Sequence, residues 1–436
     1  MKVWLAVLFV FLALSAGILI GYAIAEFAAD STRPRRKAWN ALGLGALLGI
    51  AAICLYSFGF PAGYRIGAPS PVARSRAPWE DFQFELDEIK IPRADAGEAI
   101  RSNISVPDAL AYLDQGAEVW NKKYKCIGCH VNAVYLLVRP SLSPVAGHAL
   151  TDTRDFFLKN LESFVGKKEE RLLLAGNKSA QVVWAALGLA SWDAHTSGVL
   201  SPDTDAMLRC MFRLQRENGA WSVPNCWPPL QSESFQLSAV AAIAVSMAPG
   251  WLESVNEPEL ESRIDLLRTY LQGTPPPHEY AQLWRVWAST WFPGLLKPEQ
   301  RSASLESLWK RQHEDGGWAL RDFAEPAEWG EGARQHQLEK ESDYHQAPSD
   351  GHMTGLAVCV ARDAGIPATD PRIEKAVKWI LTNQRETGRW WAKSLNTQTY
   401  EFLTYSATCF ALAALAKCDR LPIGAPLDDH PRLASK

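Results

Sequence analysis

Gln312-His-Glu-Asp-Gly-Gly-Trp318 is one of three copies of a short pattern, Gln-x-x-x-Gly-x-Trp, in this sequence. The other copies are Gln215-Arg-Glu-Asn-Gly-Ala-Trp221 and Gln384-Arg-Glu-Thr-Gly-Arg-Trp390. Internal similarity of this kind predicts an array of repeated supersecondary units. The glycine suits a left-handed cap at a helix end, and the aromatic residue after it can fold back over the turn. We therefore expect these residues to tie neighbouring helix ends together, and not to act in catalysis.

The spacing of the copies indicates paired helices. Their tryptophans are 97 and 72 residues apart. The first interval fits two helix-pair units of about 48 residues, and the second fits one unit plus a polar insertion around residues 322–350. Several stretches are apolar on nearly every face, and such helices belong in a protein interior. We therefore expect an inner layer of helices screened by an outer one, with the inner stretches at residues 182–191, 237–247, 355–362 and 405–417.

These repeats resemble the QW motifs of the terpenoid cyclase and prenyltransferase superfamily. The resemblance covers about residues 106–418 and implies an all-α fold, an α/α toroid of about five or six helix pairs around a central cavity. It does not extend to cyclase chemistry, because squalene and hopene cyclases protonate their substrate with an Asp-x-Asp-Asp motif. The acidic pairs Asp203-Thr-Asp205 and Asp428-Asp429 are too short to supply one. The zinc-dependent members place an aspartate two residues before their cysteine ligand, and no aspartate lies at that position before Cys359.

One motif carries redox chemistry. Cys126-Ile-Gly-Cys129-His130 is Cys-x-x-Cys-His, the attachment sequence of a c-type haem. The two thiols can bond the haem vinyl groups, and the adjacent histidine can be the proximal iron ligand. The alternatives are a disulfide and a metal knuckle. A zinc site is disfavoured because no second cysteine or histidine pair lies at ligand spacing, and a thioredoxin-like dithiol because no βαβ pattern surrounds the motif. We expect one haem c.

The sequence contains several candidates for the sixth ligand of such an iron. His148 lies 18 residues after His130 and is the first candidate, followed by His195, Met207 and Met211. A six-coordinate iron would carry electrons, whereas an open position would allow chemistry on oxygen, peroxide or another small ligand.

A polar cluster before the apolar stretch at 355–362 is the candidate substrate site. It contains Tyr344, His345, Asp350 and His352, which we expect near the mouth of the cavity. The alternative is that Asp350 caps the following helix and the other three lie in a solvated loop.

Two further cysteines, Cys210 and Cys226, lie 16 positions apart across the first Gln-x-x-x-Gly-x-Trp turn. They are candidates for a disulfide if the domain is in an oxidising compartment.

The N-terminal 60 residues predict a membrane anchor. Residues 3–25 and 38–60 carry no charged side chain, and each run is long enough to cross a bilayer. The loop between them holds four cations, which predicts that it is cytoplasmic and that the remainder is exported. A cleaved signal peptide ending at Ala25 is the alternative, with the same compartment for the rest. We expect a transmembrane hairpin at residues 1–60 and a linker at 61–105, with at most a short strand at 82–91. The toroid with the haem site follows at 106–418, and a tail at 419–436.

The overall composition excludes one class of partner. The net charge is −3 and no arginine-rich stripe is present, so we expect no nucleic-acid binding. The whole pattern predicts a c-type cytochrome in the bacterial inner membrane, with its toroid facing the periplasm. We expect one-electron transfer with a redox partner protein, linked by analogy to an apolar isoprenoid or lipid ligand. The alternatives are a haem enzyme that oxidises a hydrophobic substrate, and a non-redox toroid that binds a lipid or a protein.

Overall fold

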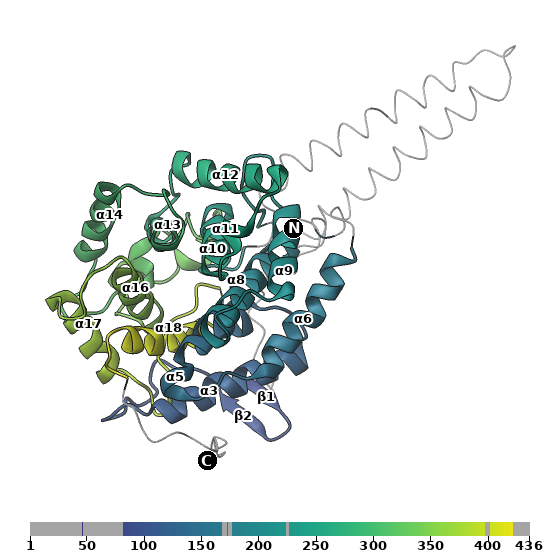
Figure 1. The fold of residues 1–436 in the computed structure, drawn as a ribbon. Helices are drawn as coiled ribbons and strands as arrows, with labels where there is room; N and C mark the ends of the chain where they lie inside the picture. Colours follow the sequence, from purple (N-terminus) through teal and green to yellow (C-terminus); the bar gives the residue numbers. More distant parts are fainter. Residues whose placement is uncertain are drawn as a thin grey trace, which may run out of the picture. The chain divides into compact units, whose positions relative to one another are not determined.

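A computed structural model describes most of the chain after the predicted anchor, and these residues are the coloured ribbon in Figure 1. The described residues are 46, 82–167, 172, 177–223, 226–396 and 402–421. Apart from Ala46, the two expected membrane spans lie outside these residues, as do residues 422–436 of the expected tail. In the described part of the chain, no helix is both long and apolar enough to cross a membrane. The anchor therefore stays a prediction.

The described residues are mostly helical. The longer helices are α3 (Val106–Val119), α4 (Val134–Val138), α6 (Thr151–Val165), α8 (Lys178–Thr196), α9 (Pro202–Arg213), α10 (Ser234–Met247), α12 (Pro258–Gly273), α13 (Glu279–Trp291), α14 (Pro298–Lys310), α16 (Gly351–Asp363), α17 (Pro371–Thr382) and α18 (Leu403–Lys417). The short elements are strands β1 (Phe82–Leu86) and β2 (Ile89–Pro92), helices α5 (Ser143–Ala146), α11 (Trp251–Ser254) and α15 (Gln335–Leu338), and single turns η1 (Trp120–Tyr124), η2 (Cys129–Ala133), η3 (Arg139–Leu142), η4 (Leu320–Phe323) and η5 (Tyr344–Gln346).

An inner ring of helices forms the centre of this body. Each helix packs against the next in the order α4, α8, α10, α13, α16 and α18, and α18 returns to α4. Five of its members, α8, α10, α13, α16 and α18, are labelled around the centre of Figure 1. In α10 every residue except Ser234 and Ser246 is buried, and α18 is buried from Leu403 to Leu415. The expected inner layer of helices that are apolar on every face is thus confirmed.

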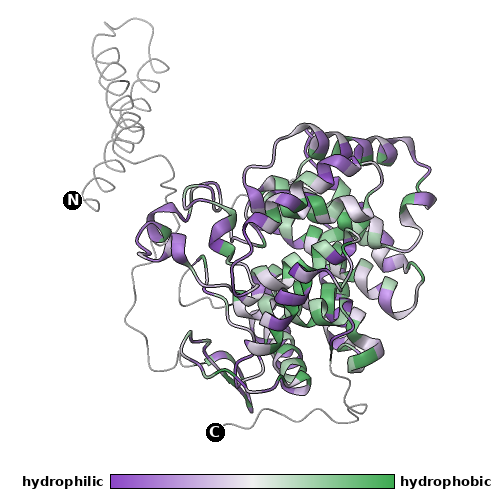
Figure 2. Cartoon of the chain, turned by 90° about the vertical axis from the view of Figure 1, so that its left-hand side faces the viewer, coloured by the Kyte–Doolittle hydropathy of each residue, from purple (hydrophilic) through white to green (hydrophobic). Residues whose placement is uncertain are grey.

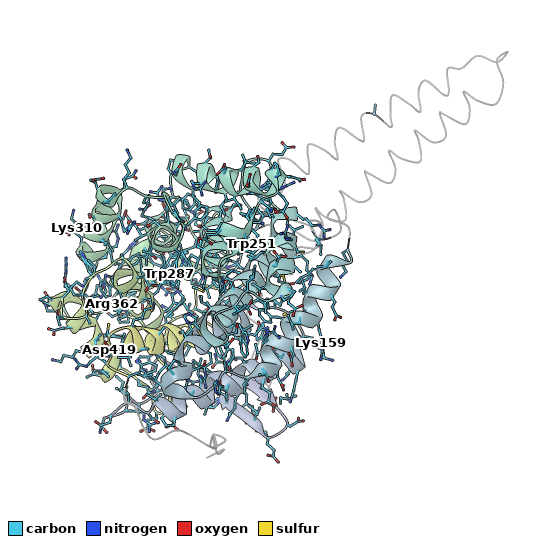
Figure 3. All side chains as sticks on the ribbon, viewed as in Figure 1. Lys159, Trp251, Trp287, Lys310, Arg362 and Asp419 are labelled. Carbon is cyan, nitrogen blue, oxygen red and sulfur yellow. The ribbon has the colours of Figure 1, made fainter. Side chains whose placement is uncertain are left out.

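Outer helices cover this ring. Helix α6 packs on α8, α9 on α8 and α10, α12 on α10, α14 on α13, and α17 on α16 and α18. Helix α12 is typical, because it buries a single stripe at helical spacing, Leu260, Ile264, Leu267 and Leu271. Hydrophobic colour accordingly gathers in the middle of Figure 2 and hydrophilic colour at the rim. In Figure 3, Lys159 of α6 and Lys310 of α14 lie at the periphery, whereas Trp251 and Trp287 lie among the helices.

This arrangement is an α/α toroid. Each outer helix can be paired with the inner helix that follows it, beginning with α3 and α4 and ending with α17 and α18. The described residues thereby form six helix pairs, the upper value of the expected range.

The three Gln-x-x-x-Gly-x-Trp copies have one geometry. Each tryptophan Nε1 donates to the carbonyl ten residues earlier in its own outer helix, at 2.8–2.9 Å. Each glycine has a positive φ, between 86° and 93°. Each glutamine Nε2 donates to the carbonyl of that glycine and to a second carbonyl at the next outer helix, which is Arg263 in α12, Arg372 in α17 or Ser105 at the start of α3. The expected tie between successive helix ends is confirmed.

The third copy belongs to a set of contacts that joins the last helices to the first, which we call the closing seam. Gln384 exchanges two hydrogen bonds with the backbone of Ser105. Arg389, 1% exposed, pairs with Glu98 at 2.9 Å. The hydroxyl of Tyr405 in α18 donates to the carbonyl of Leu113 in α3 at 2.6 Å. The ring is therefore closed by polar contacts between segments almost 300 residues apart.

Residues 82–105 differ from the linker that their composition predicts. Strands β1 and β2 form an antiparallel hairpin that contacts α3. Phe84 is fully buried, with its ring 6.2 Å from that of Tyr112 and 5.7 Å from that of Tyr405. Burial of apolar residues such as Phe84 and Ile91 favours docking of this segment on the toroid.

Substituting Gln384 tests the closing seam. Gln384 is 1% exposed and makes three polar contacts that alanine cannot make. We expect Gln384→Ala to lower the free energy of unfolding by about 2–4 kcal/mol, because backbone groups are left unsatisfied. Urea unfolding followed by tryptophan fluorescence measures this change. Gln335→Ala is the matched control, since Gln335 is exposed and contacts only Glu339 of the same segment among the described hydrogen bonds. Equal losses in both variants would contradict the prediction.

Candidate haem site

The Cys-x-x-Cys-His motif begins in the tight turn after η1 and ends in the first two residues of η2. Lys125, with φ of 54°, ends η1 in a left-handed conformation. The indole Nε1 of Trp120 then donates to the carbonyl of Cys126 at 2.9 Å. A Cβ atom at Gly128 would lie 2.6 Å from the same indole, so this turn needs a glycine there. Trp120 thus holds the motif against the end of α3.

Asn132 braces the turn from the other side. Its Oδ1 accepts from the backbone of Gly128 at 2.8 Å, and its Nδ2 donates to Asn121 Oδ1 and to the carbonyl of Cys126. Asn132 is fully buried. The backbone between the two cysteines is therefore fixed independently of any bound group.

Both cysteines of the motif are thiols. Cys126 is half-buried, Cys129 is 1% exposed, and no disulfide joins them. Burial raises the pKa of each thiol, so both are protonated at neutral pH. The Nε2 amide of Gln231 lies 2.5 Å from Cys129 Sγ. The disulfide expected as an alternative for this pair is not formed in this structure.

His130 presents an unused nitrogen. Its Nε2 is buried and has no hydrogen-bond partner among the described residues, whereas buried polar atoms are nearly always paired. Burial lowers the pKa of His130 to about 4, although the nearby carbonyls of Pro228 and Trp227, neither of which has hydrogen-bond geometry to Nε2, oppose the shift. The imidazole is thus neutral at physiological pH, which is the form that binds a metal.

These residues fit a c-type haem. The motif supplies two reduced thiols on one turn, and the orphaned His130 Nε2 is the atom that an iron would take. Among the described residues, no group of three or more histidine, cysteine, aspartate or glutamate side chains could hold a metal ion by itself.

The inner helices begin at one end of the ring with ionisable caps. Glu233 caps α10, His278 caps α13 and Asp350 caps α16, each by accepting a backbone N–H of the first turn. His278 Nε2 lies 3.3 Å from Glu233 Oε2 and links two of these caps. The cap by Asp350, the alternative to a substrate role, is confirmed. The backbone N–H of Leu320 donates to the other carboxylate oxygen of Asp350 at 2.6 Å. Burial raises the pKa of Asp350 to about 6.

His352 lies in the first turn of α16 and is fully buried. Its Nδ1 is 2.9 Å from Ser406 Oγ in α18, and its Nε2 is 3.0 Å from Tyr280 Oη in α13. Burial, followed by the charge of His130, lowers the pKa of His352 to about 3. Ser406 belongs to α18, which also packs against the turn η2 that contains His130.

Only one member of the candidate substrate cluster lies on the surface. His345 is exposed and 3.9 Å from Glu325. Tyr344 is buried, accepts from Trp329 Nε1 and donates to the carbonyl of Ala324. The ring of Trp329 lies 5.4 Å from that of Tyr280, the partner of His352, so Tyr344 and His352 are linked through two aromatic residues.

The candidate sixth ligands are dispersed. His148 is exposed, and its carbonyl accepts from Arg139, which follows α4. His195 lies in the last turn of α8, near Lys417 and Asp363 at the ends of α18 and α16. His352 lies at the other end of α16, in its first turn. The two methionines are buried in outer helix α9: Met207 and Met211. No contact that the structure describes joins any of the four to His130.

The expected disulfide between Cys210 and Cys226 is not formed in this structure. Cys210 is a buried thiol in α9, and Cys226 Sγ donates to the carbonyl of Val223 at 3.3 Å.

A polar cleft of about 870 Å³ opens between α13, α14 and the polar insertion. Its walls include His278, Arg311, His313, Asp322 and His345, so charges of both signs face it. The strongest contact is between His313 Nε2 and Asp322 Oδ2, at 2.7 Å.

This pair gives a pH dependence. The Asp322 carboxylate raises the pKa of His313 despite its partial burial. The stabilisation is full below the unfolded pKa of about 6.5 and is lost as pH rises through the folded value. We expect Asp322→Asn to cost up to about 1 kcal/mol at pH 5.5 and less at pH 8.5, measured by urea unfolding. The control is Asp343→Asn, whose partner at 3.1 Å is a lysine, Lys393, instead of a histidine. A cost for Asp322→Asn that rises with pH would refute the assignment.

Several residues around the site carry no sequence signal. Gln231, Tyr280 and Ser406 come from a loop, α13 and α18, and no motif or spacing connects them to Cys126–His130. Only the fold identifies them.

Comparisons with known proteins add a weak structural likeness. No protein-family model matches the sequence, and no protein with a curated description matches it. One solved structure that is similar is the type II terpene cyclase MstE from Scytonema, in its apo form. It is 13% identical, with a TM-score of 0.37, and the match covers 66% of this chain and 89% of that one. Because this TM-score is low, the toroid assignment here depends on the helix contacts described above.

Proposed function

We propose that this chain is a monohaem c-type cytochrome, in which Cys126 and Cys129 attach the haem and His130 binds its iron. The observation that carries the proposal is the orphaned, buried and neutral Nε2 of His130 directly after two reduced cysteines on one turn. A structural histidine would be expected to use that nitrogen in a hydrogen bond.

The surrounding residues have defined tasks in this proposal. Trp120 and Asn132 hold the turn so that both thiols and the imidazole keep their positions. The inner ring buries the site and limits water, which are factors that set a redox potential. A bound haem c supplies a one-electron redox couple. We therefore propose electron transfer as the activity.

The proposal includes a location and a ligand class. The uncharged runs at 3–25 and 38–60 would anchor the protein in the bacterial inner membrane, with the toroid in the periplasm and a redox partner beside it. The inner helices also contain a cluster of packed tryptophans, Trp184, Trp284 and Trp287, and by analogy with other toroids we propose an apolar isoprenoid or lipid as the ligand.

Haem content tests the proposal. The full chain is produced in a bacterial periplasm together with a cytochrome c maturation system and purified in detergent. The pyridine haemochrome spectrum and the mass of the denatured protein are expected to show one covalently bound haem per chain. A stable, folded chain without haem under these conditions would refute the cytochrome assignment and favour the non-redox toroid.

A further inference from the structure

The protonation of His352 can be assigned from its neighbours. Ser406 Oγ donates its single proton to the carbonyl of Leu403 at 2.9 Å. The same oxygen must then accept from His352 Nδ1, 2.9 Å away, so the proton of the neutral imidazole is on Nδ1. His352 Nε2 consequently carries a lone pair and accepts from the hydroxyl of Tyr280.

This arrangement is the one that metal-binding histidines use. Such a histidine donates one ring N–H to a protein oxygen, which fixes its tautomer and orientation, and keeps the other nitrogen for the metal. Ser406 provides that oxygen for His352. Tyr280 has a pKa well above its ordinary value because it is buried, so it stays neutral and donates to Nε2.

The segments that contain His130 and His352 both contact the inner helix α18. The turn η2, which contains His130, packs against α18, and α18 contributes the Ser406 that orients His352. On the other side, Gln231 contacts Cys129 Sγ and lies two residues before Glu233, which reaches His278 beside Tyr280. The orphaned Nε2 of His130 and the Nε2 lone pair of His352 therefore belong to segments that pack together at one end of the ring.

We propose that His352 is the second axial ligand of the haem iron whose first ligand is His130. This inference rests on the proposed function, and it makes the protein a bis-histidine, six-coordinate cytochrome. Ligation replaces the hydrogen bond from Tyr280 and leaves the bond to Ser406 in place. Six-coordination closes the iron to oxygen and peroxide, so the proposal favours an electron carrier over a haem enzyme.

Spectroscopy of the full, haem-loaded chain tests the assignment. The ferric protein is expected to be low-spin, and its near-infrared magnetic circular dichroism should match two imidazole ligands. His352→Gly should keep its covalent haem and lose the low-spin signal, and added free imidazole should restore that signal. The controls are His148→Gly and His195→Gly, which replace histidines remote from the motif and should leave the spectrum unchanged.

The possible failures are distinguishable. If the unsubstituted chain has no haemochrome signal, the proposed function fails and the ligand assignment with it. If haem content is normal but the iron is high-spin, or low-spin with a methionine signature, only the ligand assignment fails. It also fails if His352→Gly, with full haem content, stays low-spin. Because the unsubstituted protein is itself diagnostic, misfolding of the variant does not prevent a decision.

Discussion

The Cys126→Ala, Cys129→Ala double variant is expected to lose covalently bound haem completely. Each thiol supplies one of the two thioether bonds, and no other cysteine lies within the described turn from Trp120 to Ala133. Haem staining of a denaturing gel and the mass of the denatured chain measure the loss. Each single variant should retain one bond and a reduced amount of haem.

Cys210→Ala is the matched control for this result. Cys210 is a buried thiol like Cys129 but lies in the outer helix α9, so its removal should leave haem staining unchanged. Staining that persists in the double variant would show that the motif does not attach haem.

Gly388→Ala is expected to destabilise the toroid more than any other single change considered above. Gly388 has φ of 86°, and a Cβ atom there would lie 2.5 Å from the carbonyl carbon of Asp108 and 2.7 Å from the nitrogen of Ala109. The variant must therefore accept a strained backbone and also separate the turn after α17 from α3 at the closing seam. Left-handed strain costs about 1–2 kcal/mol and overpacking about 1–3 kcal/mol, so we expect a loss of about 3 kcal/mol or more.

Gly365→Ala separates the two causes. Gly365 has nearly the same φ, 92°, but a Cβ atom there would meet nothing within 4 Å. It should cost only the backbone strain, about 1–2 kcal/mol, in the same urea unfolding experiment. Equal losses of stability in both variants would show that the close approach of Gly388 to α3 makes no contribution.

The architecture could be predicted because its signals are local. Helices such as α10 and α18 are apolar on every face, and that pattern alone assigns them to an interior layer. The hairpin of residues 82–92 could not be predicted in the same way. Its burial depends on Tyr405, more than 300 positions later, and a local pattern holds no information about so distant a partner.

The candidate site was predictable to a similar extent. The attachment motif is contiguous, so Cys126, Cys129 and His130 are evident from the sequence. His352 follows His130 by 222 positions, and its place beside α18, which packs against η2, depends on which inner helices become neighbours when the ring closes. A search for a sixth ligand near the motif in sequence instead leads to His148, which the structure places on the surface.

Under the proposed function, the closing seam would impose an order of events on the maturation of the protein. Cys129 is 1% exposed in the closed ring, so an enzyme that forms thioether bonds could not reach it there. The seam needs Gln384, Arg389 and Tyr405, which follow the motif by more than 250 positions. Before these residues dock, α3 lacks its partners at the seam. We therefore expect haem attachment to precede docking of α17 and α18, which would then enclose the bound haem.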